Sequence, residues 1–493
     1  MKYRIILAVI FVFFLVSRIY KIADIPKSVY WDEASIGYNA YSIATDFRDE
    51  WGKKFPLHFR AFGEFKLPVY IYSTAILVKM IGLNEYAVRL PAVLYSLGTL
   101  IVVYLLMKRI TKNESISILS VFILTLSPWL FIFSRTGYEA TSGLFFFMLG
   151  IYIFIFNPAK KWLFLIGTLS LIASMYSYTS YRIIVPLTLL GTGLIYLKSE
   201  FKKNIIVLVL SFIIFVISII PIVRLFIYDA GFGRASSFAL IPGFQQVYDL
   251  AGKPHLQITF NRNGNINWWH NVSLIGSNYL SHFSPNFLFL KGDANPRSQI
   301  PGHGQLYLFD IPFLILGLIA IVKSKKALYY LPLIFLILSP IPASLTNESP
   351  HALRTLLAAP QFAIISAMGI VFLFERFKKY SAIILCVVII GYLLSFEQYA
   401  FDFLTKYPNE SASDWQYQYK EIFIGAPGST GVSGNKPQTE GKVTDKYGQP
   451  YIFALYYLKY PPQKFRKEVQ YNPVNNWGFS TVKSFNGFIF TDK

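Results

Sequence analysis

Long apolar runs dominate this 493-residue chain. Runs of about 17–25 apolar residues can cross the hydrocarbon core of a bilayer as helices, whereas soluble cores use shorter, periodic patterns. Only 15% of the residues are charged, against about a quarter in soluble domains. The sequence therefore predicts an all-α polytopic membrane protein. Eleven spans are predicted, at residues 5–20, 91–107, 116–133, 142–156, 162–178, 183–197, 205–226, 307–322, 328–345, 356–374 and 380–399.

Basic residues set the predicted orientation, because lysine and arginine near span ends favour the cytoplasmic side. Two basic residues precede the first span, and a basic turn follows every even-numbered span. These residues are Lys2, Arg4, Lys108, Arg109, Lys112, Lys160, Lys161, Lys198, Lys202, Lys203, Lys323, Lys325, Lys326, Arg376, Lys378 and Lys379. Eleven spans then place the N-terminus in the cytoplasm and the C-terminus outside it. The excess of 46 Lys and Arg over 26 Asp and Glu thus has a topological explanation and does not indicate nucleic acid binding.

One apolar segment, 67–82, is excluded from this count. It is short, and Lys66, Pro68 and Lys79 interrupt it. These features favour a helix lying in the membrane interface. Segment 34–45 is predicted to form a second interfacial helix of the same outer loop.

The predicted spans divide the chain into two domains. Residues 1–400 form a transmembrane domain with outer loops at 21–90 and 227–306. Residues 401–493 alternate short apolar runs with Gly and Pro, a pattern typical of a small α/β domain. This domain is predicted to be extracytoplasmic.

Two adjacent carboxylates, Asp32 and Glu33, follow the first span closely. A general base must reach the hydroxyl whose proton it accepts, and a neighbouring like charge raises its pKa. The same residues also suit the first turn of a helix, where the helix dipole favours acidic side chains. The residues alone leave general-base catalysis and helix capping both open.

A second polar turn holds Arg135 and Glu139, four residues apart. On a helix these side chains would share a face. They form either a surface ion pair worth about 0.2–0.5 kcal/mol or part of a substrate site, with a divalent cation as one option. The six histidines are scattered, without the helical pair of zinc proteases. The need for a metal therefore stays unknown.

Four further residues can meet a phosphate group. Lys66 opens the predicted interfacial helix at 67–82, and Arg182, His351 and Arg354 lie near predicted outer ends of spans. Arg182 lies on the side that the orientation rule disfavours, which suggests an anionic partner. A guanidinium such as that of Arg354 matches phosphate oxygens well. The alternatives are a Lys66 that extends along the interface, an Arg182 within the aromatic belt, and an Arg354 paired with Glu348.

Together these motifs resemble the GT-C superfamily of membrane glycosyltransferases. The nearest branch contains dolichyl-phosphate-mannose protein mannosyltransferases and bacterial aminoarabinose transferases. The resemblance is strongest over residues 20–185. The motifs that carry it are Trp31-Asp32-Glu33, Lys66-Leu67-Pro68-Val69-Tyr70, Gly82-Leu83-Asn84-Glu85-Tyr86-Ala87-Val88-Arg89-Leu90-Pro91, the Ser134-Arg135…Glu139 turn and the His351…Arg354 segment.

The resemblance implies transfer of a sugar, with inversion, from a polyprenyl-phosphate donor to an acceptor at the outer face of the cell membrane. It implies Asp32 as the general base, with Glu33 beside it and Glu139 as a further acidic residue. The candidate substrate-binding residues are Lys66, Arg135, Arg182, His351 and Arg354. A polyprenyl phosphate cannot leave the bilayer, so outer-side cations could stabilise the charge on its leaving phosphate.

A transporter or flippase of a lipid-linked or small-molecule substrate is the alternative. Transport sites tend to place ionisable groups and broken helices at mid-membrane, often in two repeated halves. In this chain the ionisable residues gather at predicted outer ends. The glycosyltransferase is therefore favoured, while the sugar, the acceptor (lipid, glycan or protein) and the oligomeric state stay open.

Overall fold

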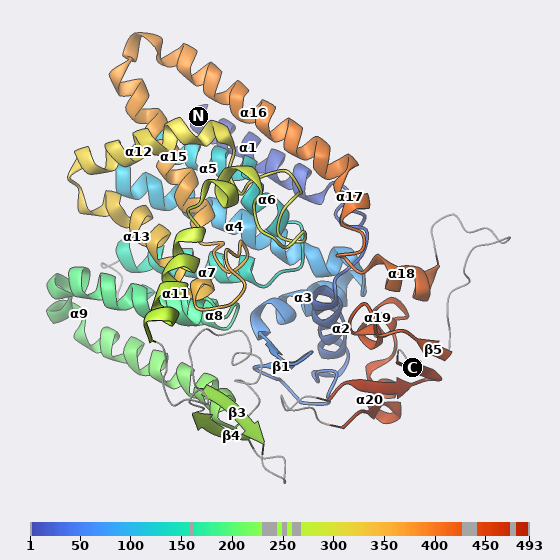
Figure 1. Cartoon of the computed structure of the whole chain (residues 1–493). Helices are drawn as coiled ribbons and strands as arrows, with labels where there is room; N and C mark the ends of the chain where they lie inside the picture. The colour runs from blue at the N-terminus through green and yellow to red at the C-terminus, as the bar shows by residue number, and fades with distance from the viewer. Residues whose placement is uncertain are drawn as a thin grey trace.

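The computed structural model describes residues 2–156, 162–228, 244–248, 254–258, 268–425, 441–473 and 480–491 (Figure 1). It is built mainly from helices. The principal bundle helices are α1 (Lys2–Ile19), α4 (Glu85–Thr111), α5 (Glu114–Leu126), α7 (Ala140–Phe156), α8 (Leu163–Met175), α9 (Tyr181–Tyr228), α12 (Ile311–Ser324), α13 (Leu331–Leu338), α15 (Ala358–Arg376) and α16 (Ser381–Thr405).

Several helices have the length and composition of membrane spans. In the described part of the chain, four stretches are long and apolar enough to cross a bilayer, namely Glu85–Thr111, Ala327–Ser344, Ala358–Arg376 and Lys378–Thr405. Shorter apolar helices lie at Pro68–Ile81, Glu114–Leu126, Ala140–Ile155, Leu163–Met175, Tyr181–Gly191 and Val209–Leu225. The chain is thus a multi-pass membrane protein, and the number of eleven spans stays a prediction.

The predicted spans are not all single helices. Predicted span 116–133 consists of α5 and α6 (Pro128–Phe133), which separate at Ser127 because Pro128 has no N–H to continue the helix. Predicted span 328–345 is likewise interrupted before α14 (Ile341–Ser344). Predicted spans 183–197 and 205–226 both lie within α9.

The backbones of α12 and α15 touch at two glycines. A Cβ atom at Gly317 would lie 2.0 Å from the carbonyl oxygen of Ile365, and one at Gly369 would lie 2.0 Å from that of Phe313. Small residues let membrane helices approach this closely. Larger side chains at either position would force the two helices apart.

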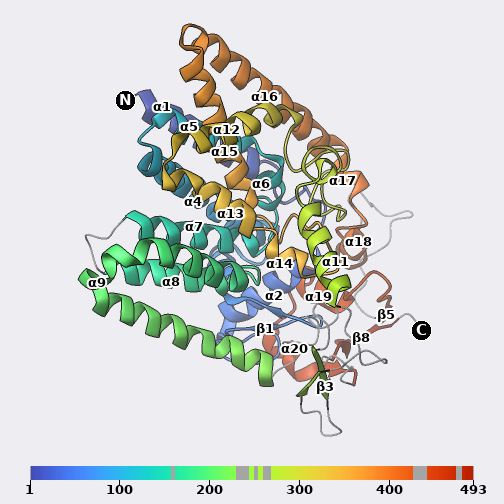
Figure 2. The same cartoon turned by 60° about the vertical axis from the view of Figure 1, so that its left-hand side comes forward.

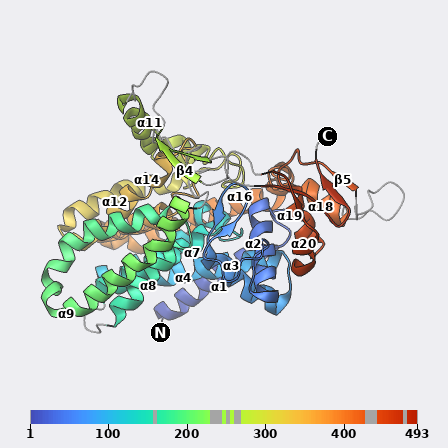
Figure 3. The same cartoon turned by 90° about the horizontal axis from the view of Figure 1, so that it is seen from below.

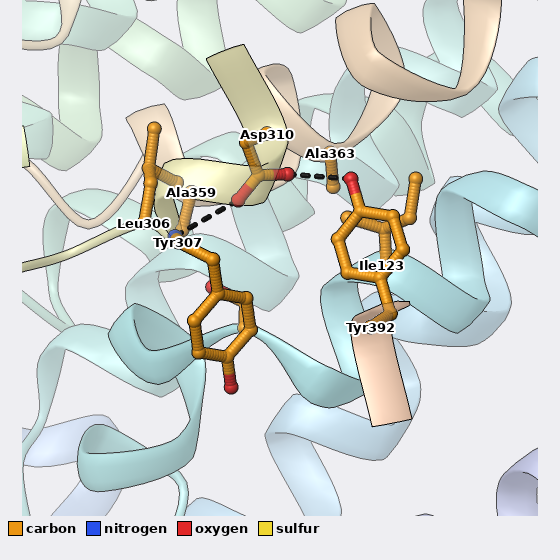
Figure 4. Close-up of a pocket in the computed structure, with 8 residues that line it drawn as sticks. Ile123, Leu306, Tyr307, Asp310, Ala359, Ala363 and Tyr392 are labelled. Carbon is orange, nitrogen blue, oxygen red and sulfur yellow. Dashed lines mark hydrogen bonds between the residues drawn. The ribbon is translucent and has the colours of Figure 1, made fainter. Parts of the chain in front are cut away.

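A carboxylate is buried where α12 begins (Figure 4). Asp310 accepts a hydrogen bond from the Tyr392 hydroxyl at 2.6 Å and another from the Tyr307 N–H at 2.9 Å. A small cavity beside it is lined by Ile123, Ser127, Leu306, Tyr307, Asp310, Ala359, Ala363 and Tyr392. Because none of the predicted site residues lines this cavity, we assign Asp310 to helix packing.

The predicted first outer loop, residues 21–90, folds into two helices and a hairpin. Helices α2 (Trp31–Asp46) and α3 (Pro68–Ile81) form where helices at 34–45 and 67–82 were predicted. The antiparallel pair β1 (Phe59–Arg60) and β2 (Phe65–Lys66) lies between them in sequence. Of the second outer loop, β3 (Phe244–Tyr248), β4 (Pro254–Ile258) and α11 (Trp268–Ser281) are described, whereas residues 229–243, 249–253 and 259–267 lie outside the described part. In Figure 2, α11 lies beside α14.

The C-terminal tail combines helices and a four-stranded sheet. Its helices are α17 (Tyr407–Glu410), α18 (Tyr417–Ile424), α19 (Pro450–Tyr457) and α20 (Pro462–Glu468). Its strands are β5 (Gly441–Val443), β6 (Gln470–Tyr471), β7 (Val482–Phe485) and β8 (Phe488–Phe490). The sheet order is β5-β8-β7-β6, with β5 parallel to β8 and the other pairs antiparallel.

The tail and the first outer loop share one hydrophobic core. Ile36 and Tyr38 of α2 and Ile71 of α3 belong to the same buried cluster as Ile452 and Phe453 of α19. Figure 3 shows α19 and α20 beside α2 at one end of the bundle, opposite the end that carries α9. The tail is therefore packed onto the helix that carries the acidic pair, and its assignment as a separate domain stays a prediction.

Candidate functional site

The two acidic residues at the start of α2 have different surroundings. Glu33 is fully buried, and its Oε2 accepts the N–H of Tyr30 at 3.3 Å, as expected for a residue that caps the helix. The side chain of Asp32 is 21% exposed, and its Oδ1 lies 2.8 Å from Lys66 Nζ. The capping interpretation therefore fits Glu33, and Asp32 faces another charged group.

Lys66 stands at the centre of an ionic cluster. Besides Asp32, its ammonium contacts Glu64 Oε1 at 2.5 Å, although the lysine side chain is only 7% exposed. Burial lowers the pKa of Lys66, but Asp32, Glu64 and Glu139 together raise it well above its ordinary value. Lys66 is thus a permanent cation surrounded by carboxylates.

Glu139 belongs to the same cluster. Its Oε1 accepts the main-chain N–H of Leu67 at 3.0 Å, next to Lys66. Burial raises the pKa of Glu139 to about 7, against the opposing effect of Lys66. The structure therefore brings together Asp32 from α2, Lys66 from β2 and Glu139 from the turn before α7.

A buried ion pair next to this cluster connects the segments that carry Asp32 and Glu139. Arg89 of α4 meets Glu33 with two N–H groups, from Nε to Oε1 and from Nη2 to Oε2, both at 3.0 Å. Its other bonds go to the carbonyls of Ile22, Pro26 and Ser28. The N–H of Gly137 donates to Glu33 Oε1 at 2.6 Å. Glu33 thus links α2 to the turn that carries Glu139.

Arg135 does not share a helical face with Glu139. Residues 134–139 form a turn, so the expected i,i+4 arrangement is absent. Arg135 is buried and donates to the carbonyls of Ser17, Arg18 and Tyr20 at 2.6–2.8 Å. These carbonyls lie at the C-terminal end of α1, where a cation is favoured by the helix dipole.

Arg182 lies at the start of α9 beside a histidine. Its Nη2 is 3.3 Å from His58 Nε2, and its Nε donates to the Met175 carbonyl at 3.3 Å. Burial, reinforced by the charge of Arg182, lowers the pKa of His58 to about 3. His58 is therefore neutral near pH 7 and accepts from the guanidinium, which can only donate.

The His351–Arg354 segment forms a separate polar group. Arg354 donates to Thr346 Oγ1 at 2.7 Å and to Glu348 Oε2 at 3.0 Å, so the pairing with Glu348 is present. The charge of Arg354 also interacts electrostatically with buried Tyr178. The charges of Glu139 and Lys66 interact with the same tyrosine. Arg354 and the ionic cluster are therefore both near enough to Tyr178 for their charges to act on it.

His351 is bonded through its main chain. Its N–H donates to His282 Nε2 at 3.1 Å, and its Nδ1 lies 3.7 Å from Asp293 Oδ2. Burial, together with nearby cations led by Arg354, lowers the pKa of His351 well below its ordinary value. His351 is therefore neutral and positions its own loop.

Three residues near the cluster were not predicted. Glu64 contacts Lys66, Arg89 holds Glu33, and Gln416 of the tail accepts the N–H of Trp31 at 3.1 Å. Gln416 thereby supplies the first turn of α2 with a hydrogen-bond acceptor that the adjacent sequence lacks. No sequence pattern points to it, because 385 positions separate the two residues.

Lys66 supplies the cation at the centre of this cluster. Across the described ranges, no group of three or more His, Cys, Asp or Glu side chains is arranged to hold a metal ion. The ammonium of Lys66 lies where it neutralises Asp32 and Glu64. The arrangement can accept a proton at Asp32 and present a cation to an anionic group.

Comparison with known proteins gives a family match over part of the chain. Residues 66–223 match the family model of dolichyl-phosphate-mannose-protein mannosyltransferases. The match begins at Lys66 and includes Glu139 and Arg182. Among curated protein sequences, none matches significantly.

Solved structures of two kinds are similar. The oligosaccharyltransferase AglB from Archaeoglobus fulgidus, in complex with an inhibitory peptide and a dolichol-phosphate, has a TM-score of 0.51 at 13% identity, over 93% of this chain and 64% of that chain. The Archaeoglobus fulgidus oligosaccharyltransferase in complex with Zn and sulfate has a TM-score of 0.53 at 13% identity, over 92% and 61%. ArnT from Cupriavidus metallidurans, bound to undecaprenyl phosphate, has a TM-score of 0.49 at 11% identity, over 93% and 84%.

These matches confirm the predicted resemblance to GT-C glycosyltransferases. At 13% identity the archaeal structures establish a shared fold. The chain covers less than two thirds of their length. Their activities and ligands are therefore those of the relatives, and the function of this chain is a matter for proposal.

Proposed function

We propose that the protein is a glycosyltransferase that moves a hexosyl or pentosyl group from a polyprenyl-phosphate donor to an acceptor at the extracytoplasmic face of the membrane. One observation carries the proposal: Asp32, Lys66 and Glu139 meet in one ionic cluster on a GT-C-like fold. The family match, which begins at Lys66, supports it. Dolichol-phosphate in the AglB complex supports a polyprenyl carrier for the donor.

Asp32 is the proposed general base. The acceptor oxygen attacks the anomeric carbon, its proton passes to Asp32, and the bond from the anomeric carbon to the phosphate oxygen breaks. The electron pair of that bond leaves with the polyprenyl phosphate, so a single displacement inverts the anomeric centre. Asp32 suits this role because its side chain is partly exposed and its ion pair with Lys66 is made through Oδ1.

Lys66 is the proposed partner of the leaving phosphate. A buried cation that is present before reaction stabilises the developing negative charge without reorganisation. Arg182 and Arg354 are proposed to guide the carrier toward this point, and the charges of Arg354 and Lys66 both act on Tyr178. Glu33 and Arg135 are proposed to have structural roles. Glu33 pairs with Arg89, and Arg135 bonds the end of α1.

The proposed topology follows the basic turns. The N-terminus is cytoplasmic, and the loops 21–90 and 227–306 and the tail 401–493 are extracytoplasmic. This orientation places the ionic cluster at the face where lipid-linked sugars are presented. The shared core of α2 and α19 supports the same side for the loop and the tail.

Transfer from a labelled donor tests the proposal. Membranes that contain the protein are incubated with radiolabelled polyprenyl-phosphate sugars, with and without a chelator, and label is followed into lipid, glycan and protein fractions. Transfer that disappears in D32N supports the glycosyltransferase. Movement of the lipid-linked sugar across the bilayer without transfer, equal in D32N, would favour a flippase.

A further inference from the structure

The ammonium of Lys66, which is proposed to receive an anion, is already paired with carboxylates. Lys66 contributes one positive charge, and Asp32 and Glu64 contact it directly. Glu139 adds a further carboxylate within reach of the lysine's charge. An approaching phosphate would therefore meet carboxylates at the ammonium itself, and like charges at short distance repel.

Of the three carboxylates, Glu64 is the one that belongs to neither a helix nor the turn before α7. Asp32 belongs to the first turn of α2, and Glu139 is bonded to the main chain at Leu67. Glu64 stands in the turn of the β1–β2 hairpin, with a side chain 30% exposed, the largest value of the Lys66 contacts. Because Glu64 lies in a hairpin turn, a change of its side-chain rotamer does not require a helix to move.

Main-chain hydrogen bonds define the shape of the hairpin turn. The Ala61 N–H donates to the Glu64 carbonyl at 2.9 Å, and the Gly63 N–H donates to the Ala61 carbonyl at 2.7 Å. Gly63 has a φ of 87°, which favours glycine there. These main-chain bonds do not involve the Glu64 carboxylate.

We propose that the Glu64 carboxylate occupies the place on Lys66 that the carrier phosphate takes, so that the donor binds by displacing it. This inference rests on the proposed function of Lys66. Glu64 thereby sets the affinity of the site for polyprenyl phosphates and keeps Lys66 neutralised when no carrier is bound. It acts as a specificity-determining residue, because only an anion that outcompetes a neighbouring carboxylate gains access to the ammonium.

The opposite role for Glu64 makes a different prediction. If Glu64 served only to hold Lys66 in position, its removal would loosen the lysine and weaken phosphate binding. If it competes with phosphate, removal strengthens binding. For a partly exposed ion pair the gain is on the order of 3- to 10-fold in the dissociation constant.

Binding of undecaprenyl phosphate to the purified protein in nanodiscs, at one fixed pH, separates the two roles. We expect E64Q to bind the carrier more tightly than the unmodified protein, and K66Q to bind it more weakly. E468Q is the matched control, because it removes a carboxylate that pairs with Lys464 on the tail, away from the cluster. E468Q is expected to bind as the unmodified protein does.

The outcomes distinguish this inference from the function on which it rests. A folded E64Q that binds equally or more weakly, while K66Q still loses binding, overturns the competition and leaves Lys66 as the phosphate partner. Equal binding by the unmodified protein and K66Q overturns both. An E64Q gain matched by E468Q would indicate a general charge effect and overturn the competition as well.

Discussion

Asp32 and Lys66 form a close ion pair within the segment 21–90, with Oδ1 and Nζ 2.8 Å apart. The pair joins the helix α2 to the strand β2 and leaves the aspartate partly exposed. In the proposed reaction Asp32 acts on the attacking acceptor and Lys66 acts on the leaving phosphate. The proton moves to the carboxylate, and the leaving charge develops toward the ammonium.

Replacement of Asp32 tests its role as a base. We expect D32N to lower kcat by about 10²- to 10⁴-fold, because an amide cannot accept the acceptor's proton. The variant should keep its folding, since Asp32 lies at a partly exposed position. Transfer assays and thermal unfolding of the same preparation check this, and a D32N enzyme with near-normal kcat would remove Asp32 from the mechanism.

Glu139 predicts a pH dependence of donor binding. Burial raises its pKa to about 7, so the group is neutral below this pH and adds a negative charge beside Lys66 above it. Donor affinity should therefore fall as pH rises through about 7. We expect the step to vanish in E139Q, which stays neutral at every pH. Donor KM from pH 6 to 8.5 is the measurement, and an identical step in both proteins would assign it to another group.

Replacement of Arg89 should cause a large loss of stability. The Arg89–Glu33 pair is fully buried, so R89M leaves an uncompensated carboxylate and should cost about 3–5 kcal/mol. The double variant E33Q/R89M should recover part of the loss, because both charges are then absent.

The matched control for Arg89 is K420M, which breaks the partly exposed pair with Glu85 and should cost about 0–1 kcal/mol. Thermal unfolding in detergent compares the variants. Equal losses for R89M and K420M would contradict the structural role assigned to the buried pair.

The burial of Glu50 leads us to predict that the stability of the folded protein depends on pH. It is buried between Trp51 and Tyr451 of the tail, and burial, with the nearby charge of Asp49, raises its pKa to about 8. The folded protein thus holds a proton that the unfolded chain releases above its ordinary pKa of 4.5. The stability that depends on this proton falls as pH rises from about 4.5 to about 8 and then levels off.

The variant E50Q should remove this dependence, because its amide stays neutral. We expect the melting temperature of E50Q to exceed that of the unmodified protein by a margin that widens up to about pH 8. Thermal unfolding between pH 5 and 9 checks the margin. A constant difference over this range would show that Glu50 does not titrate there.

The sequence carried enough information to predict a common face for Asp32, Lys66 and Glu139. The basic turns and the exclusion of 67–82 as a span placed these residues on one side, and the structure brings them into one cluster. The predicted helices at 34–45 and 67–82 match α2 and α3. Apolar run length and charge position are local properties, which is why a single sequence reveals them.

Partners across long separations could not be predicted in the same way. Arg135 and Glu139 are close in sequence, yet the turn between them sends one side chain to the end of α1 and the other to Leu67. The contact between Gln416 and Trp31 depends on how the tail packs on α2. Neither periodicity nor spacing encodes such a contact, since it arises only when the cores combine.

The core that α2 shares with α19 limits how this protein can be recombined. The tail is not an interchangeable module, because a foreign tail would bring its own surface against Ile36 and Tyr38 and shift the helix that carries Asp32. A chimera that exchanges the tail alone should lose activity. One that exchanges the tail together with residues 21–90 keeps the packing between α2 and α19 and should keep its activity. Divergence of the two segments is therefore coupled, and changes on one should be accompanied by compensating changes on the other.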